Sequence, residues 1–136
     1  PLQTMAVIRE PIDWLMSWYR YRARPEISGS ATSTAGMDFE QFVNGWLSTP
    51  EPEYARIGRQ SRFVADRDGM VIVDHLFRYE QLDHAVTFLE DRLGRKLTLP
   101  RRNISPPAKI TLSKALETRL RREAEADFAL WEKVGR

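Results

Sequence analysis

The chain has 136 residues, of which 42% are hydrophobic and 29% charged, a composition typical of one globular domain with a buried core. It contains no cysteine, which excludes disulfide bonds, thiolate zinc sites and cysteine nucleophiles. The net charge is only +2, and the balance of 21 basic and 19 acidic residues argues against a nucleic-acid-binding protein.

Other classes of protein are excluded by what the sequence lacks. It has two histidines and no HExxH motif, so we expect no metal site. No apolar run approaches the ~18 residues that a membrane span needs. No signal peptide is visible, and we therefore expect a cytoplasmic, bacterial protein.

A short strand and a closely following helix are the first predicted elements. Residues 4–8 (TMAVI) form an apolar run with β-branched members, which is typical of a buried parallel strand. Pro11 favours the start of a helix, because its fixed φ suits the first helical position. The apolar residues of 11–23 cover most of a helical circumference, which indicates a buried helix.

In the middle of the chain we predict a loop, a helix and two strands. Residues 24–36 are rich in Ser, Thr and Gly and are typical of a mobile loop. A helix begins at Met37 and ends before Ser48. A short strand is expected at 62–66, and the run 70–77 (MVIVDHLF) predicts a second buried strand.

The last third of the chain is predicted to be helical. Glu80 lies in the first turn of a helix that Gly94 ends as a C-cap. A proline-bounded connector follows at 99–107, and Ser113 caps a final helix that reaches about Val134. Strands separated by helices predict an α/β fold with a parallel sheet, incomplete in this chain and predominantly helical.

Arg9 and Ser17 are the candidate binding residues. Arg9 stands at the end of the first strand, where ligands bind in parallel α/β sheets, and just ahead of a helix N-terminus that attracts anions. Ser17 follows eight residues later, about two helical turns on, so its hydroxyl can point to the same side. An arginine fork and a hydroxyl suit a phosphate group. The alternative is an arginine paired with Glu10 or Asp13 and a serine packed within the helix.

This stretch resembles the 3′-phosphate-binding motif of sulfotransferases, which use 3′-phosphoadenosine 5′-phosphosulfate (PAPS) as sulfate donor. The matching residues are Arg9, Pro11, Ser17 and Tyr19. Three later segments are similar to blocks that follow in that family in the same order: 59–82 (vD…f.yE.L), 99–105 (lp…N.S) and 127–131 (D…ly). The resemblance therefore spans nearly the whole chain.

The resemblance implies one domain over residues 1–136 with a P-loop NTPase-like fold. It implies that Arg9 and Ser17 bind the 3′-phosphate of PAPS, or of the spent donor 3′-phosphoadenosine 5′-phosphate (PAP), without a metal. The implied reaction moves a sulfuryl group to a hydroxyl or amine of an unidentified acceptor, a carbohydrate or another small molecule.

The chain departs from the family pattern in two ways. Trp14 stands where many relatives carry a basic residue. The glycine-rich loop with a lysine that normally holds the 5′-phosphosulfate is absent. We therefore expect the C-terminal part of a sulfotransferase domain that is inactive alone, and we assign no catalytic residue.

Three further features have two interpretations each. Trp18, Tyr19 and Tyr21 either stack on adenine or fill the core, and the core is favoured because their helix is mostly apolar. Glu80 is either a general base or a first-turn carboxylate that orders its neighbours, and the second interpretation is favoured. The apolar face of the C-terminal helix suggests an alternative function, a non-catalytic helical protein-interaction module.

Overall fold

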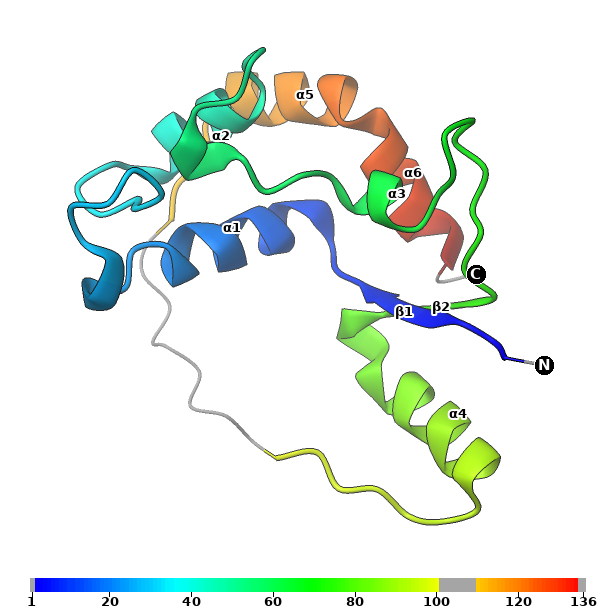
Figure 1. Ribbon diagram of the computed structural model, residues 1–136. Helices are drawn as coiled ribbons and strands as arrows, with labels where there is room; N and C mark the ends of the chain where they lie inside the picture. The colour runs from blue at the N-terminus through cyan, green and yellow to red at the C-terminus, as the bar shows by residue number, and fades with distance from the viewer. Residues whose placement is uncertain (1, 101–109, 135–136) are drawn as a thin grey trace.

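The computed structural model describes residues 2–100 and 110–134. The elements in chain order are β1 (Met5–Ile8), α1 (Pro11–Tyr21), α2 (Phe39–Trp46), α3 (Gln60–Phe63), β2 (His75–Arg78), α4 (Leu82–Leu93), α5 (Lys114–Glu123) and α6 (Glu125–Val134). Short 3-10 helices are η1 (Pro25–Ile27), η2 (Glu53–Ala55) and η3 (Tyr79–Gln81). The chain is thus a mixed α/β protein, about half helical, with a small parallel sheet (Figure 1).

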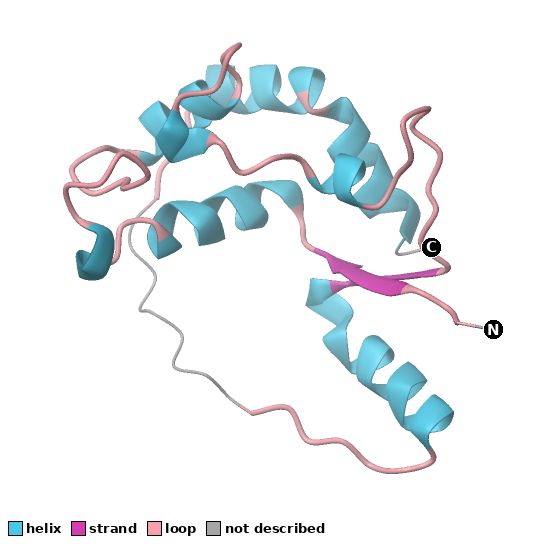
Figure 2. Ribbon diagram, viewed as in Figure 1, coloured by secondary structure: helices cyan, strands magenta, loops and turns pink. Residues whose placement is uncertain are grey.

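The sheet pairs two strands that lie far apart in the sequence. β1 and β2 run parallel, with Met5 opposite His75 and Ile8 opposite Arg78 (Figure 2). Parallel strands end at the same edge of a sheet, so the residues that follow them, Arg9 and Tyr79, become neighbours. The predicted first strand is present, but the prediction that it is buried is correct only for Ile8, since Val7 is 39% exposed. The carboxyl end of this strand is the point from which the candidate site is built.

One of the two later strand predictions is wrong and the other is half wrong. Residues 62–66 contain the end of α3 and a turn, and Ala65 makes only an isolated antiparallel bridge to Val71. The run 70–77 becomes a strand only from His75 onward. The physical reason is a local turn: the carboxylate of Asp66 accepts hydrogen bonds from the backbone N–H groups of Asp68 and Met70.

The hydrophobic core lies between α1, α2, α5 and α6. Leu15 of α1, Phe42 of α2 and Leu120 of α5 are fully buried there. The apolar face of the C-terminal region, on which the interaction-module hypothesis depends, therefore packs inside the chain.

α2 begins with a capping box, in which Asp38 and Gln41 exchange side-chain and backbone hydrogen bonds.

The single helix predicted from Ser113 to Val134 is two helices that meet at Ala124. The predicted cap is confirmed, because the Ser113 hydroxyl accepts a hydrogen bond from the N–H of Leu116. The break has a tertiary cause: the guanidinium of Arg59 donates to the carbonyl of Glu123 beside it. The buried carboxylate of Asp127, one turn later, accepts from the N–H of Ser61.

α4 lies on the opposite side of the sheet from α5 and α6 (Figure 1). Its Phe88 ring packs against His75 and Phe77 of β2, with centroid distances of 4.5 and 5.3 Å. Gly94 ends the helix in the left-handed conformation, as predicted. Most of the predicted connector, residues 101–107, lies outside the described residues. No helix of the described part of the chain is long and apolar enough to cross a membrane.

Candidate functional site

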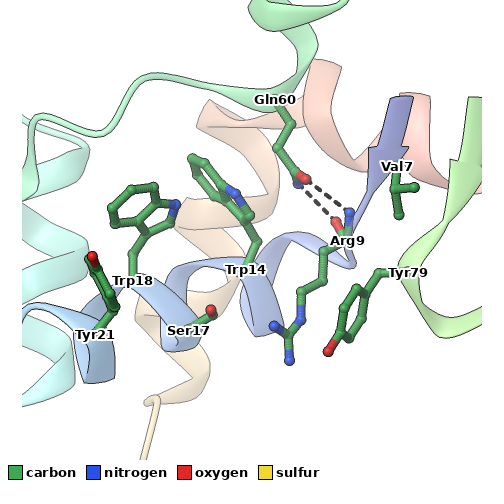
Figure 3. A pocket seen from close by; sticks show the side chains of 8 residues that line it. All are labelled: Val7, Arg9, Trp14, Ser17, Trp18, Tyr21, Gln60 and Tyr79. Atoms are coloured by element: carbon green, nitrogen blue, oxygen red, sulfur yellow. Dashed lines mark hydrogen bonds between the residues drawn. The ribbon is translucent and has the colours of Figure 1, made fainter. Parts of the chain in front are cut away.

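A cavity of about 430 Å³ lies along α1, beside the carboxyl end of β1 (Figure 3). This volume falls within the range of pockets that hold small organic ligands, roughly 300–1,000 Å³. Four lining residues share one face of α1, because three of them follow Trp14 at intervals of three, four and seven residues. The lining is completed from β1, the β1–α1 joint, α3 and η3. The lining residues are Val7, Arg9, Trp14, Ser17, Trp18, Tyr21, Gln60 and Tyr79.

The two predicted binding residues line this same cavity. Arg9 reaches it from the joint between β1 and α1, and Ser17 reaches it from the second turn of α1 (Figure 3). Helical periodicity and the parallel-strand edge are the reasons that they meet. The structure therefore brings together the two side chains that sequence spacing singled out.

The Arg9 guanidinium is stacked on an aromatic ring. Its central carbon lies 4.3 Å from the centroid of the Tyr79 ring, a cation–π contact. Among the described residues, no carboxylate forms an ion pair with Arg9, and its buried Nε has no hydrogen-bond partner. Glu10 instead caps α1, where it accepts from the N–H of Asp13 at 2.9 Å. The guanidinium therefore retains donors for an anion.

Two side chains from distant parts of the sequence hold the backbone at Arg9. Gln60 accepts from the N–H of Arg9 at 2.9 Å and donates to its carbonyl at 2.8 Å (Figure 3). Glu80 accepts from the N–H of Glu10 at 3.1 Å. Sequence reasoning missed Gln60 and Tyr79 as site residues. The available signal was their place in the 59–82 block that the sequence analysis singled out, but that block assigns them no role.

Glu80 lies in η3, just before α4, and is not one of the cavity-lining residues. Its second carboxylate oxygen accepts from the indole N–H of Trp131 at 2.8 Å. Arg78, two residues earlier, stacks on the Trp131 ring and donates to the carbonyls of Trp131 and Glu132. The contacts of Glu80 agree with a structural role rather than that of a general base. Its partners are Glu10 and Trp131, however, and not the adjacent residues that we expected it to order.

The aromatic residues of α1 divide between the core and the cavity. Tyr19 packs against Phe39 and Phe42, and its hydroxyl donates to the carbonyl of Met37 at 2.6 Å. Burial raises the pKa of Tyr19, with a smaller contribution from the charge of Asp38. The core interpretation is thus correct for Tyr19.

Trp18 and Tyr21 both line the cavity. Their rings meet edge to face at 5.8 Å, and Tyr21 is 57% exposed. The core interpretation is therefore wrong for Tyr21, whereas Trp18 packs partly against the core as well.

Further cations contact two of the aromatic residues that line the cavity, although they do not line it themselves. The guanidinium of Arg24 lies 3.9 Å from the centroid of Tyr21, and that of Arg22 lies 5.3 Å from the centroid of Trp18. Burial, and next the charge of Arg24, lower the pKa of Arg22, which donates to the carbonyl of Glu53. Cation–π contacts thus place positive charge at both ends of an aromatic wall.

The cavity offers hydrogen-bond donors and flat apolar surfaces. Residues 2–100 and 110–134 contain no cluster of three or more His, Cys, Asp or Glu side chains placed to hold a metal ion.

Comparisons of the chain with protein-family models, with curated proteins and with solved structures find no match.

Proposed function

We propose that the chain is the donor-binding part of a sulfotransferase, in which Arg9 and Ser17 bind the 3′-phosphate of PAPS or PAP. One observation carries the proposal: a guanidinium without an ion-pair partner among the described residues shares a cavity with a hydroxyl, at the carboxyl end of a parallel strand. Arginine's planar fork matches two phosphate oxygens, and the serine hydroxyl supplies a further donor. The ordered resemblance of four sequence segments supports the same assignment.

The rest of the cavity suits the adenosine part of the donor. A volume of about 430 Å³ exceeds what a single phosphate group needs. Trp14, Trp18 and Tyr21 provide ring faces and edges, and stacking of a nucleobase on an aromatic side chain is worth about 1–3 kcal/mol. In this proposal the phosphate lies at Arg9 and the base lies toward Tyr21.

The reaction assigned to the sulfotransferase is sulfuryl transfer from PAPS to a hydroxyl or amine acceptor. The bond between sulfur and the bridging oxygen of the 5′-phosphate breaks, a bond from sulfur to the acceptor forms, and the acceptor loses a proton. Stabilisation of the charge that develops on the bridging oxygen belongs to a 5′-phosphosulfate site. The residues named here bind and orient the donor, and the two-stranded sheet belongs, in the proposal, to a P-loop NTPase-like fold.

The proposal is tested by calorimetric titration of the protein with PAP and with 5′-AMP, which differ by the 3′-phosphate. We expect PAP to bind more tightly, because only PAP can engage Arg9 and Ser17. Equal affinities for the two nucleotides, or no binding of PAP, would remove the assignment. Inorganic phosphate as a third ligand separates anion binding from nucleotide recognition, and it should bind more weakly than PAP.

A further inference from the structure

We infer that Gln60 is a positioning residue for Arg9: it orients the guanidinium by holding the backbone from which that side chain extends. The inference rests on the proposed function where it concerns ligand binding. The positioning itself is a property of the ligand-free protein and is tested separately below.

Gln60 is a buried amide whose side chain serves the backbone of a single residue. It is 7% exposed, and both of its polar atoms are used: the carbonyl oxygen accepts from the N–H of Arg9 and the amide nitrogen donates to the carbonyl of Arg9. A residue of a neighbouring strand satisfies its partner in the same way. Gln60 thus takes the place of a pairing strand at the point where β1 has ended and α1 has not begun.

The peptide unit that joins Arg9 to Glu10 is held at both of its polar groups. Gln60 donates to its carbonyl, and Glu80 accepts from its N–H. Glu80 is in turn fixed by the indole N–H of Trp131 on α6. Two elements other than β1 and α1 therefore bond to one peptide plane, and a third, α6, fixes one of the two side chains that do so; together they restrain the backbone at Arg9.

With the backbone fixed, Tyr79 completes the restraint on the side chain. The guanidinium lies on the Tyr79 ring at 4.3 Å and faces the cavity (Figure 3). A binding group that is already ordered loses less conformational entropy when its ligand arrives. The loss of Gln60 would leave the Arg9 charge in place and remove its orientation, which distinguishes positioning from direct binding.

The test replaces Gln60 by methionine, which keeps a similar length but cannot make either hydrogen bond. The readout in the absence of ligand is the NMR signal of the Arg9 Nε–H, which the Tyr79 ring current displaces from the position of a free arginine. Arg9→Lys assigns the signal, and Tyr79→Leu gives its position without the ring. Gln41→Met is the matched control, because Gln41 also makes a side-chain hydrogen bond to a backbone N–H, at the start of α2.

We expect the Arg9 signal in Gln60→Met to move toward its position in Tyr79→Leu, and to stay unchanged in Gln41→Met. The preference for PAP over 5′-AMP should fall about tenfold or more in Gln60→Met alone, since a small misplacement of a binding group is costly. Loss of stability alone would lower the melting temperature of both variants without moving the signal.

An unmoved Arg9 signal in folded Gln60→Met overturns the inference, whatever the nucleotide affinities are. A displaced signal, together with equal binding of PAP and 5′-AMP by the unaltered protein, upholds the role of Gln60 and removes the proposed function. Gln60→Glu provides an independent test if the methionine variant does not fold. It keeps the acceptor for the Arg9 N–H and sets an oxygen against the Arg9 carbonyl, so the same displacement is expected and its absence counts against the inference.

Discussion

Arg9 owes its properties to the groups that surround it more than to its own chemistry. Its neighbour is an aromatic ring, and no carboxylate in the described part of the chain forms an ion pair with it. A ring face attracts the cation without using its N–H donors, which therefore stay available.

Replacing Arg9 by alanine is expected to weaken PAP binding by about 1.5–3 kcal/mol, the contribution of a charged hydrogen bond. The affinity of Arg9→Lys for PAP should fall between those of the unaltered protein and Arg9→Ala, because lysine keeps the charge and loses the planar fork. Calorimetric titration measures both. Arg67→Ala, at an exposed arginine that is not one of the cavity-lining residues, is the control and should bind PAP unchanged. Equal affinity in Arg9→Ala and the unaltered protein would show that Arg9 does not contact the ligand.

Asp74 makes the stability of the folded protein depend on pH, through hydrogen bonds at the start of the sheet. Its carboxylate accepts from the N–H of Thr4 at 2.8 Å and from the Thr4 hydroxyl at 3.1 Å. These hydrogen bonds, the backbone one first, lower the pKa of Asp74. Because the folded protein has the lower pKa, the stabilisation is complete above the ordinary pKa of an aspartate and is lost as the pH falls through the lowered value.

We expect Asp74→Asn to be less stable than the unaltered protein at neutral pH and equally stable in strong acid. Thermal unfolding followed across this range measures the difference. A difference that is constant with pH would contradict the assignment of the effect to ionisation of Asp74. Asp68→Asn is the control, since the Asp68 carboxylate makes no hydrogen bond among the described residues.

At the level of the elements, α4 depends on the conformation of the residue that ends it. Gly94 has φ of +66°, in the left-handed region, and its N–H donates to the carbonyl of Glu90. A Cβ at this position meets no atom within 4 Å, so the backbone conformation alone sets the cost of substitution.

Gly94→Ala should destabilise the protein by about 1 kcal/mol, and Gly94→Asn should cost less because asparagine tolerates the left-handed region. Chemical denaturation measures the free energy of unfolding of the two variants. Hydrogen exchange in α4 should increase in the alanine variant. An asparagine variant that is as unstable as the alanine variant would show that a contact, and not φ, determines the cost.

The elements that could be predicted from the sequence are those with local signals. Pro11 at a helix start, Ser113 as a cap and Gly94 as an end act within one or two turns of their own helix, and the structure has each where expected. The break at Ala124 was not predictable in this way, because the groups that stabilise it, Arg59 among them, lie more than sixty residues away. The turn at residues 66–70 was missed because its apolar neighbours resemble a buried strand.

The part of the candidate site that depends on local sequence was predictable, and the part that depends on distant contacts was not. Arg9 and Ser17 share a side of one strand–helix unit, so their spacing was sufficient to place them together. Gln60 and Tyr79 reach the site through the fold, from positions fifty to seventy residues away along the chain. Sequence spacing carries no information about such contacts, and their chemistry became visible only in three dimensions.

On the scale of the whole molecule, the cavity depends on a core that it does not itself contain. Leu15 on the inner face of α1 packs in the cluster that includes Phe42 and Leu120, whereas the outer face of α1 carries the cavity. The position of α1, and with it that of the cavity wall, is therefore set by packing against α2 and α6 within this cluster. The sheet adds a second restraint, since β1 leads directly into Arg9 and α1.

Leu120→Ala is expected to lower the free energy of unfolding by about 2–5 kcal/mol, because it leaves a cavity in a fully buried region. Leu93→Ala is the matched control. Leu93 is 59% exposed, and the same truncation there should change stability by about 0.5 kcal/mol or less. Denaturant unfolding measures both. Equal effects would mean that the α5 face is not part of the core.

The aromatic wall also gives the protein an optical signal of its own. Two of the four tryptophans, Trp14 and Trp18, border the cavity, whereas Trp46 is buried with its indole N–H on the carbonyl of Gly58 and Trp131 is bound to Glu80. Tryptophan emission depends on solvent and on nearby π-systems, so an occupant of the cavity alters the emission of Trp14 and Trp18. Trp46 packs edge to face on Trp14 at 6.1 Å, so the internal reference is Trp131, which is not one of the cavity-lining residues. Occupancy can thus be followed in unlabelled protein by its intrinsic fluorescence.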